Sequence, residues 1–214
     1  FEARAKRMCP GFAVFDGNRD LVLSIVGRVG HIPLAVELAA AQVRDLGLQA
    51  LAESMEEGLG ALGGEDQGGR HDALDSAVDW SWALLEPWEK QALLHCSVFR
   101  GGFTIDAAEE VVDLSPWPDA PWVMDVLHSL VDSSLLHAAD VGASGRLHMY
   151  EAVADFAARR LVEPGEMQGP DGAELNGPGA LIAAKRRHAA HFARYCEDLS
   201  DRPLPKALVS QPLM

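Results

Sequence analysis

Apolar residues recur at helical spacing along the first part of the chain. This period predicts helices over residues 1–7, 19–29 and 48–57, with a further helix that begins at Pro33. Proline suits the first helical position, because its φ is already helical and no N–H donor is needed there. Asn18 is a favoured N-cap residue for the helix that follows it, and Gly47 is expected to end the helix that Pro33 begins. We interpret residues 1–57 as a small helical domain.

The second stretch, residues 70–162, changes from helical to extended patterning near its end. Helices are predicted from about Arg70 to Leu85, from Pro87 onward, and over residues 107–112, 122–131 and 151–161. Residues 103–105 read as a short strand, and Asp106 is placed to cap the helix after it. Two extended runs, 134–138 and 146–150, flank a turn-forming segment and indicate a hairpin. Helices followed by a terminal hairpin are the order of a winged helix-turn-helix domain.

The remaining segments predict linkers and one long helix. Residues 58–69 and 163–179 are rich in turn-forming residues and are interpreted as linkers. Residues 180–199 predict a helix without a packing partner in this chain, so we interpret 180–214 as the start of a helical-repeat region. The expected fold class is therefore mainly α: a helical domain, a winged helix-turn-helix with a short β-hairpin, and an isolated helix of a truncated repeat region.

Composition narrows the function classes. Lys and Arg total 18 and Asp and Glu total 32, which gives a net charge of −14. A broad nucleic-acid surface would be basic, so direct nucleic-acid binding is not expected. The apolar runs are shorter than the roughly 20 residues of a membrane span. Cys9, Cys96 and Cys196 form no CxxC pair, which argues against a disulfide framework or a zinc ribbon. A cytoplasmic protein without membrane contact fits best.

No catalytic motif is visible. A P-loop needs Gly-Lys-Ser or Gly-Lys-Thr, and none of the lysines precedes Ser or Thr. His188 and His191 lie three residues apart without further zinc ligands. We therefore expect neither enzyme activity nor a metal site in this chain. Because the sequence starts at Phe1, inside a predicted helix, we also expect it to be a piece of a longer protein.

The tryptophans concentrate in the second domain. All five fall between Trp80 and Trp122, which favours a packed aromatic core there, with Trp117 in a proline-rich loop at a domain interface. Helix 122–131 is the candidate recognition helix of the winged-helix unit, and it contains no Lys or Arg. Groove readers need basic or amide side chains, so we do not expect this helix to read DNA.

Six motifs, in chain order, resemble those of STAND-class signal-transduction ATPases, in particular bacterial regulators related to NB-ARC proteins. In the helical domain, the similar segments are Phe1–Ala5 ("LFxxRA") and Ile32–Ala41 ("GLPLAIELAAAR"). In the second domain they are Ala77–Leu85 ("IDWSYxLL"), Ser97–Phe103 ("SVFxGGF"), Leu130–Leu136 ("LVDKSLL") and Met149–Ala157 (the start of the "ETVREYA" helix). The resemblance covers about residues 1–161 and, more weakly, 188–195.

The resemblance implies a nucleotide-binding arrangement. A P-loop domain outside this chain would hold ATP or ADP, the helical domain would close over it, and tetratricopeptide-like repeats would follow from about residue 180. The family's proline that packs near the adenine matches Pro33, while His31 replaces the glycine of its "GxP" motif. Tyr150 stands at the histidine of its phosphate-contacting "MHD" motif. A tyrosine hydroxyl can donate a hydrogen bond but carries no imidazolium charge. His31, Pro33 and Tyr150 are the candidate nucleotide-binding residues.

Two functions remain open from the sequence. The first is the regulatory part of an ATP/ADP-controlled switch that couples a repeat-type sensor to an output such as a transcription factor, protein kinase or cyclase. Its partners would be the P-loop domain and the repeat region of the same protein, and the whole protein would be an ATPase. The alternative is a stand-alone winged-helix adaptor that binds proteins without nucleotide.

Overall fold

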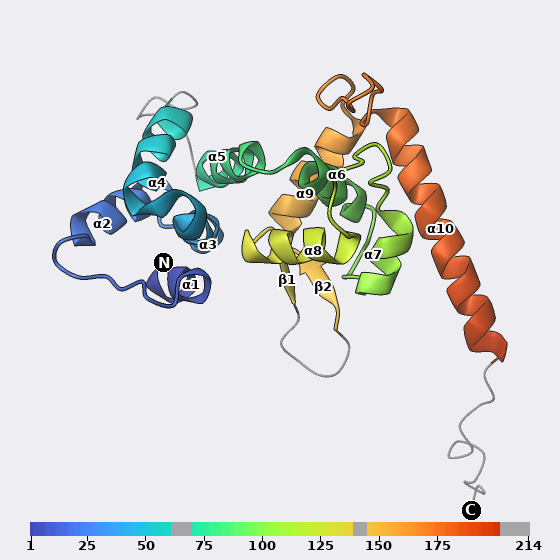
Figure 1. Cartoon of the computed structure of the whole chain (residues 1–214), viewed down its shortest axis with the longest axis horizontal. Helices are drawn as coiled ribbons and strands as arrows, with labels where there is room; N and C mark the ends of the chain where they lie inside the picture. The colour runs from blue at the N-terminus through green and yellow to red at the C-terminus, as the bar shows by residue number, and fades with distance from the viewer. Residues whose placement is uncertain (61–69, 139–144, 202–214) are drawn as a thin grey trace, which may run out of the picture.

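The structure is a computed structural model that describes residues 1–60, 70–138 and 145–201. Within these residues, ten helices and one two-stranded antiparallel hairpin make up the regular structure (Figure 1). The prediction of a mainly α fold with a short β-hairpin is confirmed. The chain forms two neighbouring groups of helices, with the longest helix along the outer side of the second group.

The first group contains α1 (Glu2–Met8), α2 (Arg19–Arg28), α3 (Pro33–Ala41) and α4 (Val43–Gly60). Pro33 occupies the start of α3 as predicted. The prediction that Gly47 ends the helix begun by Pro33 is wrong, because that helix ends at Ala41. Gly47 instead breaks the helical path within α4, at φ 74° and ψ 162°. The buried face of α3 is built mainly from alanines with Leu38 among them, which allows close helix approach.

Asn18 plays a different part from the one predicted. It stands at the N-cap of α2, but its side chain makes no cap hydrogen bond. Its Oδ1 accepts from the Phe15 N–H at 2.9 Å, and its Nδ2 donates to the Ala13 carbonyl at 2.9 Å. The side chain therefore stabilises the loop before α2.

The second group contains α5 (Arg70–Ala83), α6 (Pro87–Cys96), α7 (Ile105–Val111), α8 (Val123–Asp132), β1 (Leu136–Ala138), β2 (Leu147–Met149) and α9 (Glu151–Val162). In the hairpin, Leu136 pairs with Met149 and His137 with His148. The strand predicted at 103–105 is reduced to one bridge, between Phe103 and Leu147. The cap of α7 is Thr104, whose hydroxyl accepts from the Ala107 N–H at 3.2 Å. The prediction that Asp106 caps this helix is wrong, because the helix begins one residue before it.

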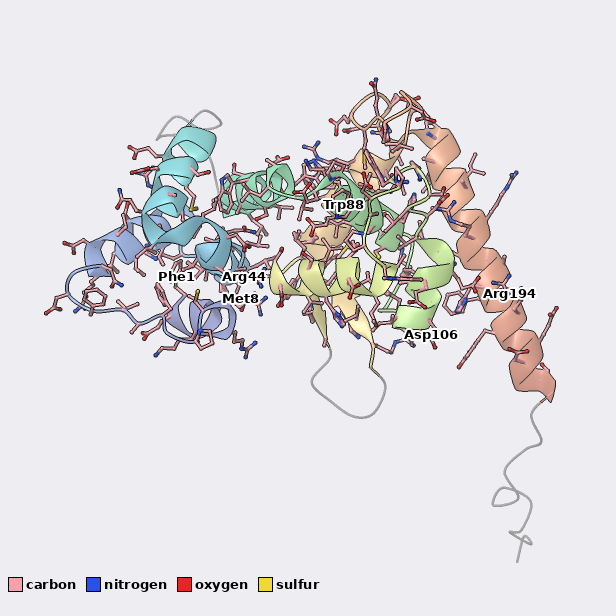
Figure 2. All side chains as sticks on the ribbon, viewed as in Figure 1. Phe1, Met8, Arg44, Trp88, Asp106 and Arg194 are labelled. Carbon is pink, nitrogen blue, oxygen red and sulfur yellow. The ribbon has the colours of Figure 1, made fainter. Side chains whose placement is uncertain are left out.

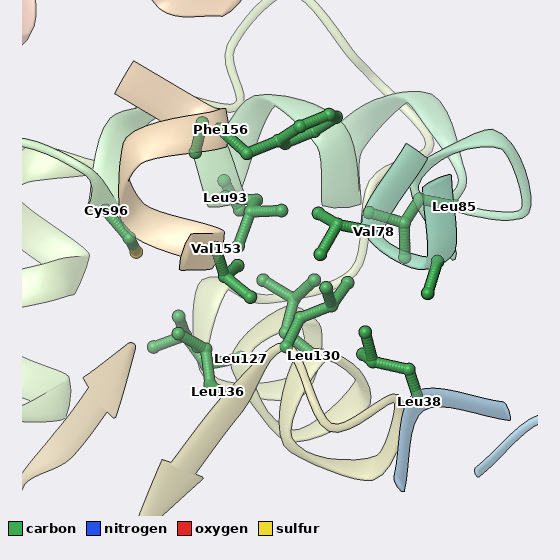
Figure 3. Close-up of a cluster of buried hydrophobic side chains, with 14 of the residues drawn as sticks. Leu38, Val78, Leu85, Leu93, Cys96, Leu127, Leu130, Leu136, Val153 and Phe156 are labelled. Carbon is green, nitrogen blue, oxygen red and sulfur yellow. The ribbon is translucent and has the colours of Figure 1, made fainter. Parts of the chain in front are cut away.

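The core of the second group is formed by leucine, valine and phenylalanine side chains from α6, α8, β1 and α9 (Figure 3). Leu93, Leu127, Leu130 and Leu136 are fully buried. Leu38 of α3 approaches the same cluster, so the buried apolar side chains run from the first group into the second.

Only some of the tryptophan side chains are buried in the core. Trp80 is buried, whereas Trp122, at the N-cap of α8, is 83% exposed, so the expected core position is wrong for Trp122. The Nε1–H of Trp117 donates to the Gln91 side chain at 2.7 Å, which ties the proline-rich loop to α6.

The last helix, α10 (Pro178–Asp201), lies along α7 and α9 (Figure 1). The expectation that it has no partner in the chain is wrong. Its contact face is formed by a fully buried Ala184, by partly buried Leu181 and Phe192, and by Arg187. The periodicity did not indicate this face, because alanine and arginine do not form a strong apolar stripe.

The predicted linkers differ in how far the structure describes them. Residues 61–69 lie outside the described residues, and 58–60 form the end of α4. The segment before α10 contains buried residues, among them Met167 and Asn176. The Asn176 side chain donates to the carbonyls of Arg160 and Glu163, which attaches this segment to the end of α9. The division into domains stays a prediction.

Candidate functional site

The two groups of helices meet at a polar contact centred on Arg4 of α1. One terminal nitrogen of Arg4 donates to the carbonyl of Val131 at 2.7 Å and to that of Asp132 at 2.9 Å. These are the last two residues of α8, where helical carbonyls have no partner within the helix and carry a partial negative charge. The Arg4 guanidinium therefore caps the C-terminus of α8 from the neighbouring group.

Further polar residues surround this contact. Arg44 of α4 forms an ion pair with Asp132 at 3.2 Å, and Figure 2 shows Arg44 on the side of the first group that faces α8. Ser134, just after α8, has a left-handed φ of 62°, and its hydroxyl donates to the Glu37 carbonyl at 3.5 Å. We call Arg4, Glu37, Arg44, Asp132 and Tyr150 the Arg4 junction.

Tyr150 brings the hairpin into this junction. Its ring stacks on His137 with ring centroids 4.4 Å apart. Burial, followed by the charge of Glu37, raises the pKa of Tyr150, so its hydroxyl keeps its proton at neutral pH. Burial and then the neighbouring His148 lower the pKa of His137, against the opposing effect of Glu37.

Two buried polar atoms lie at this contact without a hydrogen-bond partner among the described residues. They are Nε of Arg4 and Nδ1 of His137. Burial, and next the charge of Arg7, lower the pKa of Arg4, while Glu37 and Asp132 act in the opposite direction. A buried polar atom without a hydrogen-bond partner costs free energy. The polar contacts at this junction are therefore incompletely satisfied.

The three predicted nucleotide-binding residues occupy different surroundings. His31 is exposed in the turn before α3, where it has a φ of 57°. Pro33 is exposed at the first turn of α3. Tyr150 is half-buried at the N-cap of α9 and interacts with Glu37, one helical turn after Pro33. Their roles toward a nucleotide stay predictions.

Two surface hollows lie away from these residues. One, of about 230 Å³, is lined by Val14, Phe15, Asp16, Arg19, Val22 and Leu23. Another, of about 290 Å³, lies between α7 and α10 and is lined by Asp106, Glu109, Glu110, His191, Arg194, Tyr195 and Asp198. Both are smaller than the ~300–1,000 Å³ of usual small-molecule sites. Neither is lined by His31, Pro33 or Tyr150.

Within the second group, Gly102 lies directly against the hairpin. Gly102 has a φ of 85°, and a Cβ built there would lie 2.5 Å from Cε1 of His148. Arg146 donates to the Gly102 carbonyl at 2.6 Å. The imidazole of His148 therefore lies directly against a backbone that has to lack a side chain.

Among the described residues, no group of three or more His, Cys, Asp or Glu side chains gathers so that it could hold a metal ion. None of the described helices combines the length and apolarity needed to cross a membrane.

The sequence did not indicate Arg4 as a junction residue. Its acceptors are backbone carbonyls 127 and 128 residues away, and a carbonyl leaves no signature in side-chain patterning. Glu37 was part of a motif, but its place beside Tyr150 depends on how the two groups pack.

Comparisons with known proteins give relatives with regulatory names. The chain is 35% identical over 171 residues to "Putative HTH-type transcriptional regulator Rv0890c" of Mycobacterium tuberculosis, a match that covers 78% of this chain and 19% of that protein. It is 31% identical over 166 residues to "Regulatory protein AfsR" of Streptomyces coelicolor, over 74% of this chain and 16% of that protein. No family model matches the chain.

A third relative is covered more fully. It is the uncharacterized protein Rv0894 of Mycobacterium tuberculosis, 29% identical over 192 residues, which cover 88% of this chain and 46% of that protein. The chain thus spans about a fifth of the length of the first relatives and under half of this one. Along most of its length, it is similar to bacterial proteins that are named as regulators.

Proposed function

We propose that this chain is the regulatory portion of a transcription-controlling signalling switch of the STAND class, in which ATP and ADP favour different arrangements. The observation that carries the proposal is the length of the match to the HTH-type regulator. A continuous stretch of 171 residues in a chain of 214 has to contain all of residues 70–162 and the end of α4. The similarity to a regulator therefore includes parts of both groups of helices.

In this proposal the two groups act as a movable lid. A P-loop domain elsewhere in the protein holds the nucleotide, with Pro33 and His31 toward the base and Tyr150 toward the phosphates. A nucleotide shifts such an equilibrium only as far as its affinities for the two arrangements differ. The Arg4 junction suits a changing contact, because Arg4 and the neighbouring His137 each have a buried nitrogen without a hydrogen-bond partner among the described residues.

Nucleotide affinity of the natural protein that contains this chain tests the proposal. Isothermal titration calorimetry with ADP and with ATP should give a measurable dissociation constant for each. Tyr150→Phe removes one hydroxyl donor and should weaken ADP binding about tenfold, which corresponds to about 1.4 kcal/mol. Tyr195→Phe is the matched control, because Tyr195 is half exposed on α10; its ADP affinity should equal that of the wild type.

The outcomes separate the two functions. Equal ADP affinity in Tyr150→Phe and wild type would remove the phosphate-contacting role of Tyr150. Absence of binding of either nucleotide at millimolar concentration would remove the switch, and the winged-helix adaptor would take its place. A transcription reporter, measured with the wild-type natural protein and with Arg4→Met, tests whether a change in the arrangement of the lid alters transcription.

A further inference from the structure

A second arginine attaches α10 to the winged-helix group. The Nε–H of Arg187 donates to the carbonyl of Val111 at 2.7 Å, at the last residue of α7. Its terminal nitrogens lie 3.7 Å from the Asp113 carboxylate and 3.4 Å from Nε2 of His95. We call Arg187, His95, Asp113 and the Val111 carbonyl the Arg187 junction.

His95 makes this junction unusual. The side chain is 3% exposed, and its Nδ1 accepts from the Asp113 N–H at 3.2 Å. Burial, followed by the charge of Arg187, lowers the pKa of His95 to about 4, with Asp113 acting in the opposite direction. The imidazole is therefore neutral at pH 7, and a cationic guanidinium can lie against it without like-charge repulsion.

Apart from Arg187, α10 packs on the group mainly through small or partly buried side chains. Ala184 is the apolar side chain that α10 buries fully among the described residues, and alanine contributes little area. Beyond Arg187, His188 and Phe192 meet the Phe99 ring edge-on at centroid distances of 5.1 and 6.5 Å. The Arg194–Glu110 ion pair is more than half exposed and stabilises little.

The geometry of α10 resembles that of a lever. The segment before it is attached to the end of α9 through Asn176, and Gly177 donates to the Leu161 carbonyl at 2.8 Å. The opposite end extends past α7 (Figure 1), and Figure 2 shows Arg194 on the side facing α7. The attached end can act as a pivot, and Arg187 lies between the pivot and the extended end.

We propose that Arg187 is a latch: α10 exchanges between a docked and a released position, and Arg187 sets the balance between them. In the docked position, Arg187 caps the end of α7 and covers His95. Release removes the hydrogen bond to Val111 and exposes the Phe99 side of the group. A force applied at the far end of α10 would thereby reach α7 and the winged-helix core. The latch requires no nucleotide and goes beyond the proposed function.

Hydrogen–deuterium exchange of the natural protein, without added nucleotide, tests the latch. Arg187→Met keeps the length of the stem and removes the charge and the donors. Exchange should rise about tenfold in peptides that cover residues 105–113 and 178–194, with little change over residues 33–41. Arg186→Met is the matched control, because Arg186 carries the same charge on the adjacent, exposed position; its exchange should equal that of the wild type.

A second variant keeps the test decisive if Arg187→Met folds poorly. Arg187→Lys retains the charge and loses the Nε–H donor, so it should raise exchange in the same two segments by a smaller factor. Unchanged exchange in Arg187→Met would overturn the proposal. An equal rise over all segments in both variants, including 33–41, would overturn it too, because Arg187 would then support global stability and not a separate docked position.

Discussion

The two junctions of this molecule use the same side chain for the same purpose. Arg4 caps the end of α8, and Arg187 caps the end of α7. In both, a guanidinium from a neighbouring helix meets carbonyls that have no partner within their own helix. Arginine suits this task because its several donors stay charged even when burial lowers its pKa, as it does for both residues.

The surroundings of the two arginines differ. Arg4 contacts two carbonyls near Glu37 and Tyr150, and Tyr150 keeps its proton well above neutral pH. Arg187 contacts one carbonyl, a carboxylate and a buried imidazole that titrates near pH 4. The neighbours of the two arginines therefore differ in kind, but both contacts contain a histidine whose pKa burial lowers: His95 at Arg187, and His137 beside Tyr150 at Arg4.

The largest effect should come from the core that both junctions share. Leu130 of α8 is fully buried, and truncating such a leucine leaves a cavity. Leu130→Ala should lower the free energy of unfolding by about 4 kcal/mol in urea titrations and loosen both junctions together. Met124→Ala is the control, because the Met124 side chain on α8 is 42% exposed. It should change the free energy of unfolding by less than about 0.5 kcal/mol. A loss confined to one junction would show that the two do not share a core.

Acid should weaken the contact between α10 and α7 through His95. His95 has a pKa of about 4 when folded and about 6.5 when unfolded, so the unfolded chain binds more protons in this interval. Stability should therefore fall as the pH falls from about 6.5 to 4, by up to about 3 kcal/mol. Exchange in α10 peptides should rise in the same interval.

His95→Asn tests the source of this pH dependence. The asparagine oxygen can accept from the Asp113 N–H as Nδ1 of His95 does, but it does not titrate. The variant should lose much less stability between pH 6.5 and 4 than the wild type. The Asp113 carboxylate titrates lower: burial alone would raise its pKa, but hydrogen bonds from Ser115 and the charge of Arg187 outweigh burial and lower it. An undiminished pH dependence in His95→Asn would assign the effect to another group.

Removing the Arg4 side chain should lower the free energy of unfolding by less than Leu130→Ala or the protonation of His95. Arg4→Met removes the charged donor from the carbonyls of Val131 and Asp132, although Val131 keeps the Ser134 N–H. The loss should be about 2 kcal/mol, because hydrogen bonds to charged groups contribute more than neutral ones. Thermal unfolding measures the loss. Arg7→Met is the control on the exposed side of α1 and should stay within about 0.5 kcal/mol of wild type. Equal losses in the two variants would mean that Arg4 acts through net charge alone.

The Arg44–Asp132 ion pair should matter least. Both side chains are nearly half exposed, and solvent screens such pairs. Arg44→Ala should change stability by less than about 0.5 kcal/mol, and the change should vanish in 0.5 M salt. A double-mutant cycle with Asp132→Ala measures the coupling directly. A coupling above about 1 kcal/mol would show that the Arg4 junction is less solvated than its exposure indicates.

Local signals in the sequence predicted many elements well. Pro33 and Pro87 start helices as expected, because each residue acts through its own backbone geometry. Gly47 does interrupt a helix, but that helix is α4 and not the one that Pro33 begins. The hairpin also forms between the predicted runs. Capping was harder to predict: Thr104 and Asp106 both suit an N-cap, and the pairing of Phe103 with Leu147 places the helix start at Thr104.

The junctions could not be predicted in the same way. Arg187 reaches a carbonyl 76 residues away, and neither partner marks its position by residue type. The α10 face was missed for a related reason, since Ala184 packs through its small size and Arg187 through its stem and charge. The nucleotide-binding roles of His31, Pro33 and Tyr150 came from the family resemblance alone and remain to be measured.

The close contact between Gly102 and His148 restricts which substitutions the gene can carry at position 102. Every missense change of the glycine codon adds at least a methyl group, at a φ of 85° and against the imidazole. Alanine, the mildest of these changes, already meets both obstacles. In a saturation library of the coding sequence, alleles at position 102 should therefore be depleted. A shorter side chain at position 148 should relieve the contact with the imidazole but not the strain of the positive φ.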